Sequence, residues 1–162
     1  MSASRACAED AVFEAPLLRH IGIFTWNVEK TAAFLSTLLP RMEQWIHVER
    51  VYEEKDVIVG TPCRMLQALS RCGEVPYELV QPIDSPDSYQ ARVLRKNGEG
   101  FQHIAYVYPN HFDAVLARMH AHGYETVWAG QRQGGPRVYY LGIPGTGIAV
   151  EILDRALPHP SR

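Results

Sequence analysis

The chain contains an imperfect internal repeat, and this repeat constrains its fold more than any other feature of the sequence. Residues 20–23 (HIGI) are echoed by residues 103–106 (HIAY), 83 positions later. After each copy, an asparagine followed by an amphipathic segment occurs at that same spacing, and residues 78–80 (ELV) are echoed by residues 151–153 (EIL) at a spacing of 73. Ordered echoes of this kind indicate two copies of one structural unit.

Both copies contain the same predicted order of elements, which is a strand, a helix and three further strands. In the first copy, Asn27 is placed to cap the helix, whose apolar residues recur at helical spacing until Pro40 stops it. In the second copy, Asn110 takes the capping position and Gly123 closes the helix. Strands are expected over 17–25, 44–52, 63–70, 77–82, 101–108, 125–129, 136–141 and 147–153, with a longer loop in the first copy over 53–62.

A short helix between the copies is expected to begin at Ser85 and Pro86 and to end at Gly98. The sequence therefore predicts an α+β fold with a first βαβββ module over residues 17–84, a linking helix over 85–100 and a second βαβββ module over 101–154. Flexible segments are expected at the two ends, over residues 1–16 and 155–162.

The composition restricts the partners of the chain. Of 162 residues, 46% are hydrophobic and 21% are charged, which is typical of a globular protein with a sizeable core. A net charge of −2 gives no electrostatic reason to expect nucleic acid or a membrane as a partner, and no apolar run reaches the roughly 20 residues of a membrane span. Three cysteines without CxxC spacing, and no apolar secretory region near the start, predict a cytoplasmic protein.

Each copy carries one histidine on its first strand and one glutamate on its last strand, namely His20, Glu78, His103 and Glu151. Strand alternation puts each of them in an otherwise apolar row. A buried carboxylate needs a partner, because burial of an unpaired charge is costly, and imidazole and carboxylate together suit Zn, Ni, Co, Mn or Fe(II). Alone, each residue has an ordinary structural explanation, but at matched positions of two repeats the four predict one divalent metal site.

Four segments of the chain, HIGIFTWNVEKTAAFL, YELVQP, LRKNGEGFQHIAY and GIAVEIL, resemble the vicinal oxygen chelate superfamily of glyoxalases, bleomycin-resistance proteins and extradiol dioxygenases. The resemblance covers residues 17–154 and is closest to methylmalonyl-CoA epimerase, with GEGFQHIAY as its most specific part. It implies that the two modules form a half-open, barrel-like sheet around the metal. The metal positions of the family fall on His20, Glu78, His103 and Glu151.

The resemblance also implies a reaction. A divalent ion with open positions can bind two vicinal oxygens of a small-molecule substrate and stabilise the enolate that forms when the neighbouring carbon loses a proton. Glutamates act as bases in the epimerase and the glyoxalase, so Glu151 is the first candidate base and Glu78 the second. We therefore expect a metal-dependent isomerase of the epimerase type or a glyoxalase-type lyase. Superfamily members often pair modules across subunits, which leaves a homodimer open.

One position departs from the epimerase pattern. Alignment on the pair Met65-Leu66 puts Cys63 where the epimerase has its second catalytic glutamate, so a two-base epimerisation lacks one base. A buried apolar role suits this thiol better than proton transfer. Other polar side chains that could approach the substrate are Arg64, Gln67, Gln102, Arg137 and Tyr139, and three tryptophans are candidates for the pocket wall or the core, namely Trp26, Trp45 and Trp128.

Two other functions stay open at this point. An extradiol-type dioxygenase would use Fe(II) with two histidines and one carboxylate, and the additional Glu78 argues against it. A metal-free small-molecule binding protein of the bleomycin-resistance type would not need four residues of ligand type. The sequence does not select among possible acid or thioester substrates.

Overall fold

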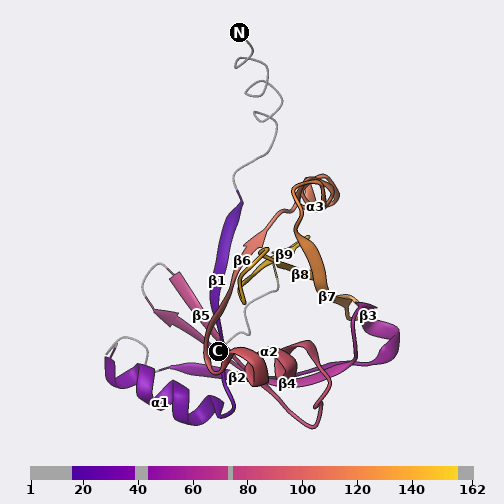
Figure 1. The fold of residues 1–162 in the computed structure, drawn as a ribbon. Coiled ribbons are helices and arrows are strands. Elements are labelled where there is room, and N and C mark those ends of the chain that lie inside the picture. Colours follow the sequence, from indigo (N-terminus) through magenta and orange to yellow (C-terminus); the bar gives the residue numbers. More distant parts are fainter. Residues whose placement is uncertain (1–15, 39–43, 73–74, 157–162) are drawn as a thin grey trace.

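A computed structural model describes residues 16–38, 44–72 and 75–156. Within these ranges the strands form one mixed, nine-stranded sheet in the order β2-β4-β5-β1-β6-β9-β8-β7-β3, which curls into a half-open barrel (Figure 1). This confirms the predicted α+β fold with a barrel-like sheet. The ends over 1–15 and 157–162, which were expected to be flexible, lie outside the described residues, as does Pro40. The assignment of 17–84, 85–100 and 101–154 to modules and linker stays a prediction.

The elements follow the repeated order that the sequence indicates. The first half contains β1 (Leu17–Phe24), α1 (Val28–Leu38), β2 (Trp45–Tyr52), the 3₁₀-helix η2 (Glu54–Asp56), β3 (Val57–Val59), β4 (Cys63–Cys72) and β5 (Val75–Pro82). After α2 (Tyr89–Asn97), the second half contains β6 (Gly100–Val107), α3 (Phe112–Ala121), β7 (Glu125–Gln131), β8 (Arg137–Gly142) and β9 (Ala149–Leu153). No helix in the described part of the chain is both long and apolar enough to cross a lipid bilayer.

The middle of the sheet joins the two halves. Strands β1 and β6 lie next to each other and pair antiparallel (Figure 1). In each half the first strand also pairs parallel with the last strand, β1 with β5 and β6 with β9. The four strands β5-β1-β6-β9 therefore bring the histidine strand and the glutamate strand of both halves together.

The helix boundaries agree in part with the expected caps. Asn27 caps α1, because its Oδ1 accepts a hydrogen bond from the backbone N–H of Lys30 at 2.9 Å. Gly98 ends α2 with a φ of 80°, a conformation that favours glycine. The start of α2 was predicted too early: the helix begins at Tyr89, and the hydroxyl of Ser88 accepts from its first turn.

The cap predicted for α3 was wrong by one position. His111, not Asn110, occupies the N-cap position, and its side chain makes no capping hydrogen bond. The helix still begins at Phe112, because this side chain and Val115 pack onto the outer face of the sheet beside Leu141 and Ile152. Tertiary packing therefore holds this end of the helix where the capping signal does not.

The segment over 53–62, predicted as a loop, is partly ordered into η2 and β3. Strand β3 comes from the first half of the chain but pairs with β7 of the second half, with Val57 opposite Gly130. The indole N–H of Trp128 donates to the carbonyl of Thr61 at 3.0 Å, and its ring contacts Tyr52 edge to face at 4.9 Å between centroids. Strand β3, which belongs to the first half, thus adds an edge strand next to β7 of the second half.

The core is divided between the two faces of the curled sheet. Helix α1 covers the outer face over β4 and β5 through Val28 and Ala32, which pack on Ala68 and Leu79. The inner face carries the largest cluster, whose buried members include Phe24, Met65, Val80, Ala105, Trp128, Tyr140 and Leu153. Helices α1 and α3 pack on outer-face residues, so the interior of the half-barrel is filled by side chains of the sheet together with Tyr89 and Leu94 of α2.

Candidate metal centre

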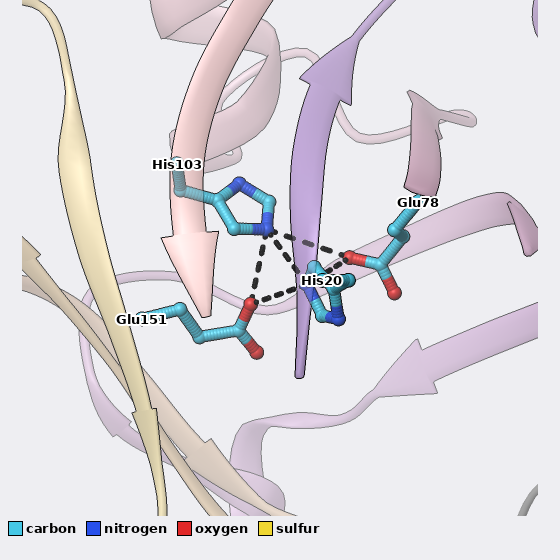
Figure 2. Close-up of side chains that lie close together, drawn as sticks. All are labelled: His20, Glu78, His103 and Glu151. Carbon is cyan, nitrogen blue, oxygen red and sulfur yellow. Dashed lines mark hydrogen bonds and ion pairs between the residues drawn. The ribbon is translucent and has the colours of Figure 1, made fainter. Parts of the chain in front are cut away.

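Four side chains converge inside the half-barrel. His20 comes from β1, Glu78 from β5, His103 from β6 and Glu151 from β9, and all four are buried (Figure 2). One potential ligand atom from each residue lies within 4.8 Å of the ligand atoms of the other three. The structure therefore brings together every residue of the metal site predicted from the sequence.

The distances between these atoms define one small centre. Nε2 of His20 lies 3.1 Å from Oε2 of Glu151, 3.2 Å from Oε2 of Glu78 and 3.1 Å from Nε2 of His103. Nε2 of His103 lies 3.0 Å from Oε2 of Glu151 and 3.5 Å from Oε2 of Glu78. A single cation at this centre would satisfy two imidazole nitrogens and two carboxylate oxygens at once.

The strand register explains why these residues meet. On β1, Gly22 lies opposite Glu78 of β5 on one side and opposite His103 of β6 on the other. A Cβ atom at Gly22 would lie only 1.8 Å from Cε1 of His103, so the absence of a side chain there leaves the space that the imidazole occupies. Gly22, the glycine of HIGI, thus belongs to the site, although no role for it was predicted from the sequence.

A hydrogen-bond chain orients His103. Nδ1 of His103 donates to Oε1 of Gln102 at 2.8 Å, and Nε2 of Gln102 donates to the hydroxyl of Tyr89 at 2.6 Å. Gln102 is the extra residue where the pairing of β1 with β6 shifts by one position, and such a bulge re-aims a side chain. This tautomer leaves Nε2 of His103 free for a metal, so buried Gln102 orients a candidate ligand and is not among the residues that line the cavity described below.

The charges of the cluster compensate one another. Burial alone would lower the pKa of His20, but the charges of Glu78 and Glu151 outweigh it and raise this pKa to about 10. Burial would raise the pKa of both carboxyl groups, but the neighbouring His20 lowers the pKa of each below its ordinary value. The centre therefore keeps two carboxylates ionised, and this donor set fits Zn, Ni, Co, Mn or Fe(II).

A cavity opens beside the centre. Glu78, Glu151 and His20 line it, whereas His103 lies fully buried behind them. Its polar lining also includes Arg19, Arg50, Tyr52, Gln67 and Tyr140, and its apolar lining is Met65, Leu69, Trp128, Val138 and Leu153. Both carboxylates are thus placed to contact a molecule bound in this cavity.

The other residues singled out in the sequence fall into two groups. Gln67 and Trp128 line the cavity. The remaining ones lie elsewhere: Arg64 pairs with Glu49 on the outer surface, Arg137 pairs with Asp113 and Asp154, Tyr139 packs against Phe112, Trp45 donates to Ser36 and Trp26 is exposed. Sequence reasoning missed Arg50, Tyr52 and Tyr140, although alternation along β2 and β8 would have put them on the inner face.

Cys63 is buried in the inner core cluster with Phe24, Met65 and Val80. Burial raises the pKa of its thiol to about 12, so the group is protonated at neutral pH. A protonated, buried thiol is a poor proton acceptor, which agrees with the packing role predicted for Cys63.

Comparison with known proteins gives the family. The family model described as glyoxalase/bleomycin resistance protein/dioxygenase superfamily matches residues 19–140. Methylmalonyl-CoA epimerase from Mycobacterium tuberculosis is similar in structure, with a TM-score of 0.60 and 21% identity, over 86% of this chain and 88% of that chain. A hypothetical protein from Bacillus halodurans has a TM-score of 0.62 and 20% identity, over 91% of this chain and 100% of that chain.

A third similar structure is a Streptomyces coelicolor methylmalonyl-CoA epimerase variant in complex with 2-nitronate-propionyl-CoA. Its TM-score is 0.54 at 24% identity, over 84% of this chain and 92% of that chain. At these identities the three structures establish a shared fold. No curated protein matched the sequence. The family model spans most of the chain, and the chain belongs to the glyoxalase/bleomycin resistance protein/dioxygenase superfamily.

Proposed function

We propose that this protein is a divalent-metal-dependent isomerase or lyase. It would remove a proton from the carbon next to a carbonyl in a small acid or thioester that binds through two vicinal oxygens. The observation that carries this proposal is the convergence of His20, Glu78, His103 and Glu151, all buried, at one centre beside a cavity.

In this proposal, residues of the chain bind the metal ion and transfer the proton. His20, His103 and the two carboxylates would hold the ion, which as a Lewis acid would stabilise negative charge on the oxygens of the substrate. Glu151 is the proposed base, and Glu78 the second candidate, because both line the cavity and a bound cation would keep both carboxylates ionised. A ligating carboxylate can accept the proton only if it leaves the ion or binds it loosely.

Cys63 limits the kind of reaction. It stands where the epimerase pattern has a second catalytic glutamate, and its raised thiol pKa rules out an easy proton transfer there at neutral pH. We therefore assign all proton transfers to Glu151 and Glu78. Among the similar structures, the epimerases support a thioester as the first substrate class to examine.

Solvent deuterium exchange tests the proposal without requiring the product to be known. The protein is stripped of metal, reloaded separately with Co, Ni, Zn, Mn or Fe(II), and incubated in deuterated buffer with a panel of acyl thioesters and small 2-oxo and 2-hydroxy acids. Exchange at the α-carbon with at least one metal, and none in stripped protein, is expected. Failure of every metal to bind would favour a metal-free binding protein, and oxygen uptake with catechols and Fe(II) would favour a dioxygenase.

A further inference from the structure

The cavity beside the metal centre is lined by the guanidinium group of Arg50, and only one of its N–H donors is used within the described part of the chain. Arg50 lies on β2, is half-buried, and lines this cavity. Its Nε donates to Oε1 of Gln67 at 3.3 Å. In the described part of the chain this amide is its one hydrogen-bond acceptor, and no carboxylate pairs with it. The terminal amino groups of Arg50 thus lack a protein acceptor among those residues.

The register of the sheet fixes Arg50 on the inner face. It pairs with Met65 of β4, a residue of the inner core cluster, while the neighbouring Val48 pairs with Gln67. Glu49, next to Arg50 on the strand, alternates to the outer surface and pairs there with Arg64. On these two paired strands, Arg64 is therefore neutralised outside the barrel, and Arg50 lines the cavity.

The charge balance of the cavity makes Arg50 significant. The acidic residues that line the cavity are Glu78 and Glu151. A divalent cation held by these carboxylates and two neutral imidazoles neutralises them, so the positive charge of Arg50 then has no counter-charge in the lining, which also contains Arg19. Apolar and aromatic walls such as Met65 and Trp128 weaken the screening of this charge by water.

We propose that Arg50 determines substrate specificity by binding an oxyanion group of the substrate, a carboxylate or a phosphate, apart from the two oxygens that the metal chelates. A guanidinium offers two parallel N–H donors to such a group, which a lysine does not. Gln67 is the positioning residue, because its amide oxygen holds Nε of Arg50. This inference rests on the proposed function and narrows its substrates to acids or thioesters with an additional anionic group.

Hydroxamates test this inference, because their two adjacent oxygens chelate a metal and their tails can be varied. Calorimetry on the metal-loaded protein compares acetohydroxamate with hydroxamates of several chain lengths that end in a carboxylate, a phosphonate or an uncharged carboxamide. At one chain length, the hydroxamate with a carboxylate or phosphonate tail is expected to bind at least about ten times more tightly than the one with a carboxamide tail. The better of the two anionic tails identifies the oxyanion.

Two variants isolate the contribution of Arg50. Arg50→Met is expected to abolish the preference for an anionic tail while leaving the affinity for acetohydroxamate unchanged, which also reports an intact metal centre. Arg50→Lys is expected to keep part of the preference. Arg64→Gln, which removes the outward arginine on the paired strand β4, is the matched control and should keep the whole preference.

The outcomes separate this inference from the proposed function. Equal affinity for anionic and uncharged tails in the wild type, or an unchanged preference in Arg50→Met, overturns the role of Arg50 and leaves the metal chemistry intact. Metal-loaded wild type that does not bind acetohydroxamate overturns the proposed function, and the role of Arg50 falls with it.

Discussion

Gly22 shows how a single residue decides whether the centre can form. The His103 ring occupies the volume that a side chain at this position would fill, and the φ angle of Gly22 is not positive, so alanine meets no backbone strain there. We expect Gly22→Ala to displace His103 and to lower metal affinity by at least about tenfold, as the loss of ligand orientation does in other metal sites. Metal titration with circular dichroism as a folding control checks this, and an unchanged affinity would contradict the assigned role of Gly22.

Glu151 carries the proposed chemistry at the residue scale. Glu151→Gln keeps the size of the side chain but removes the basic carboxylate, so the rate of α-proton exchange is expected to fall by about a hundredfold or more. Glu78→Gln, from the equivalent position of the first half, is the comparison and should have the smaller effect. Metal content is measured in both variants, and full exchange activity in metal-loaded Glu151→Gln would assign the base to another group.

The individual residues of the site differ in how far the sequence reveals them. His20, Glu78, His103 and Glu151 could be predicted because the repeat presents each type twice, at matched positions. Gly22 and Arg50 could not be assigned from one sequence, since their roles depend on which residue lies opposite in the neighbouring strand. Gln102 was misjudged for the same reason: the bulge that turns it toward His103 is a property of strand pairing.

At the scale of elements, β3 joins the first half of the chain to the edge of the second. Local patterns predicted the main strands and helices, but β3 has only three residues and finds its partner in β7, far along the chain. A strand this short gives no periodic signal, and its pairing depends on contacts such as that of Trp128 with Thr61. Long-range pairing, which leaves no local trace, explains why a loop was expected.

The indole hydrogen bond of Trp128 is expected to hold β3 in place. Trp128→Phe removes the donor to Thr61 while keeping an aromatic ring, and the free energy of unfolding should fall by about 1 kcal/mol. Amide hydrogen exchange at Val57 and Val59 should become faster. Trp45→Phe removes an equivalent indole bond, to Ser36, far from β3 in the sheet order, and is the control. Equal acceleration in both variants would refute a local effect.

The whole molecule should respond to metal through pH. An imidazole binds a metal only through an unprotonated nitrogen. The two carboxylates, however, raise the pKa of His20 to about 10 in the metal-free centre. His20 is then protonated below that pH, and the same carboxylates raise the pKa of His103, so metal binding near pH 7 is expected to release at least one proton. Apparent affinity should rise between pH 6 and pH 9, by about tenfold per pH unit for each proton released. Calorimetry in buffers of different ionisation enthalpy measures the proton, and affinity independent of pH would contradict this state of His20.

The pairing of β1 with β6 has a consequence for the assembly of the molecule. Each half of the chain supplies one imidazole and one carboxylate to this centre, so neither half alone could coordinate a cation here with more than two of these side chains. An ion bound here would cross-link the two halves of the chain, and it would stay bound only while β1 and β6 remain paired. A small separation of β1 from β6 would weaken the contacts of all four ligands at once. We therefore expect the ion to dissociate before helices α1 and α3 unfold.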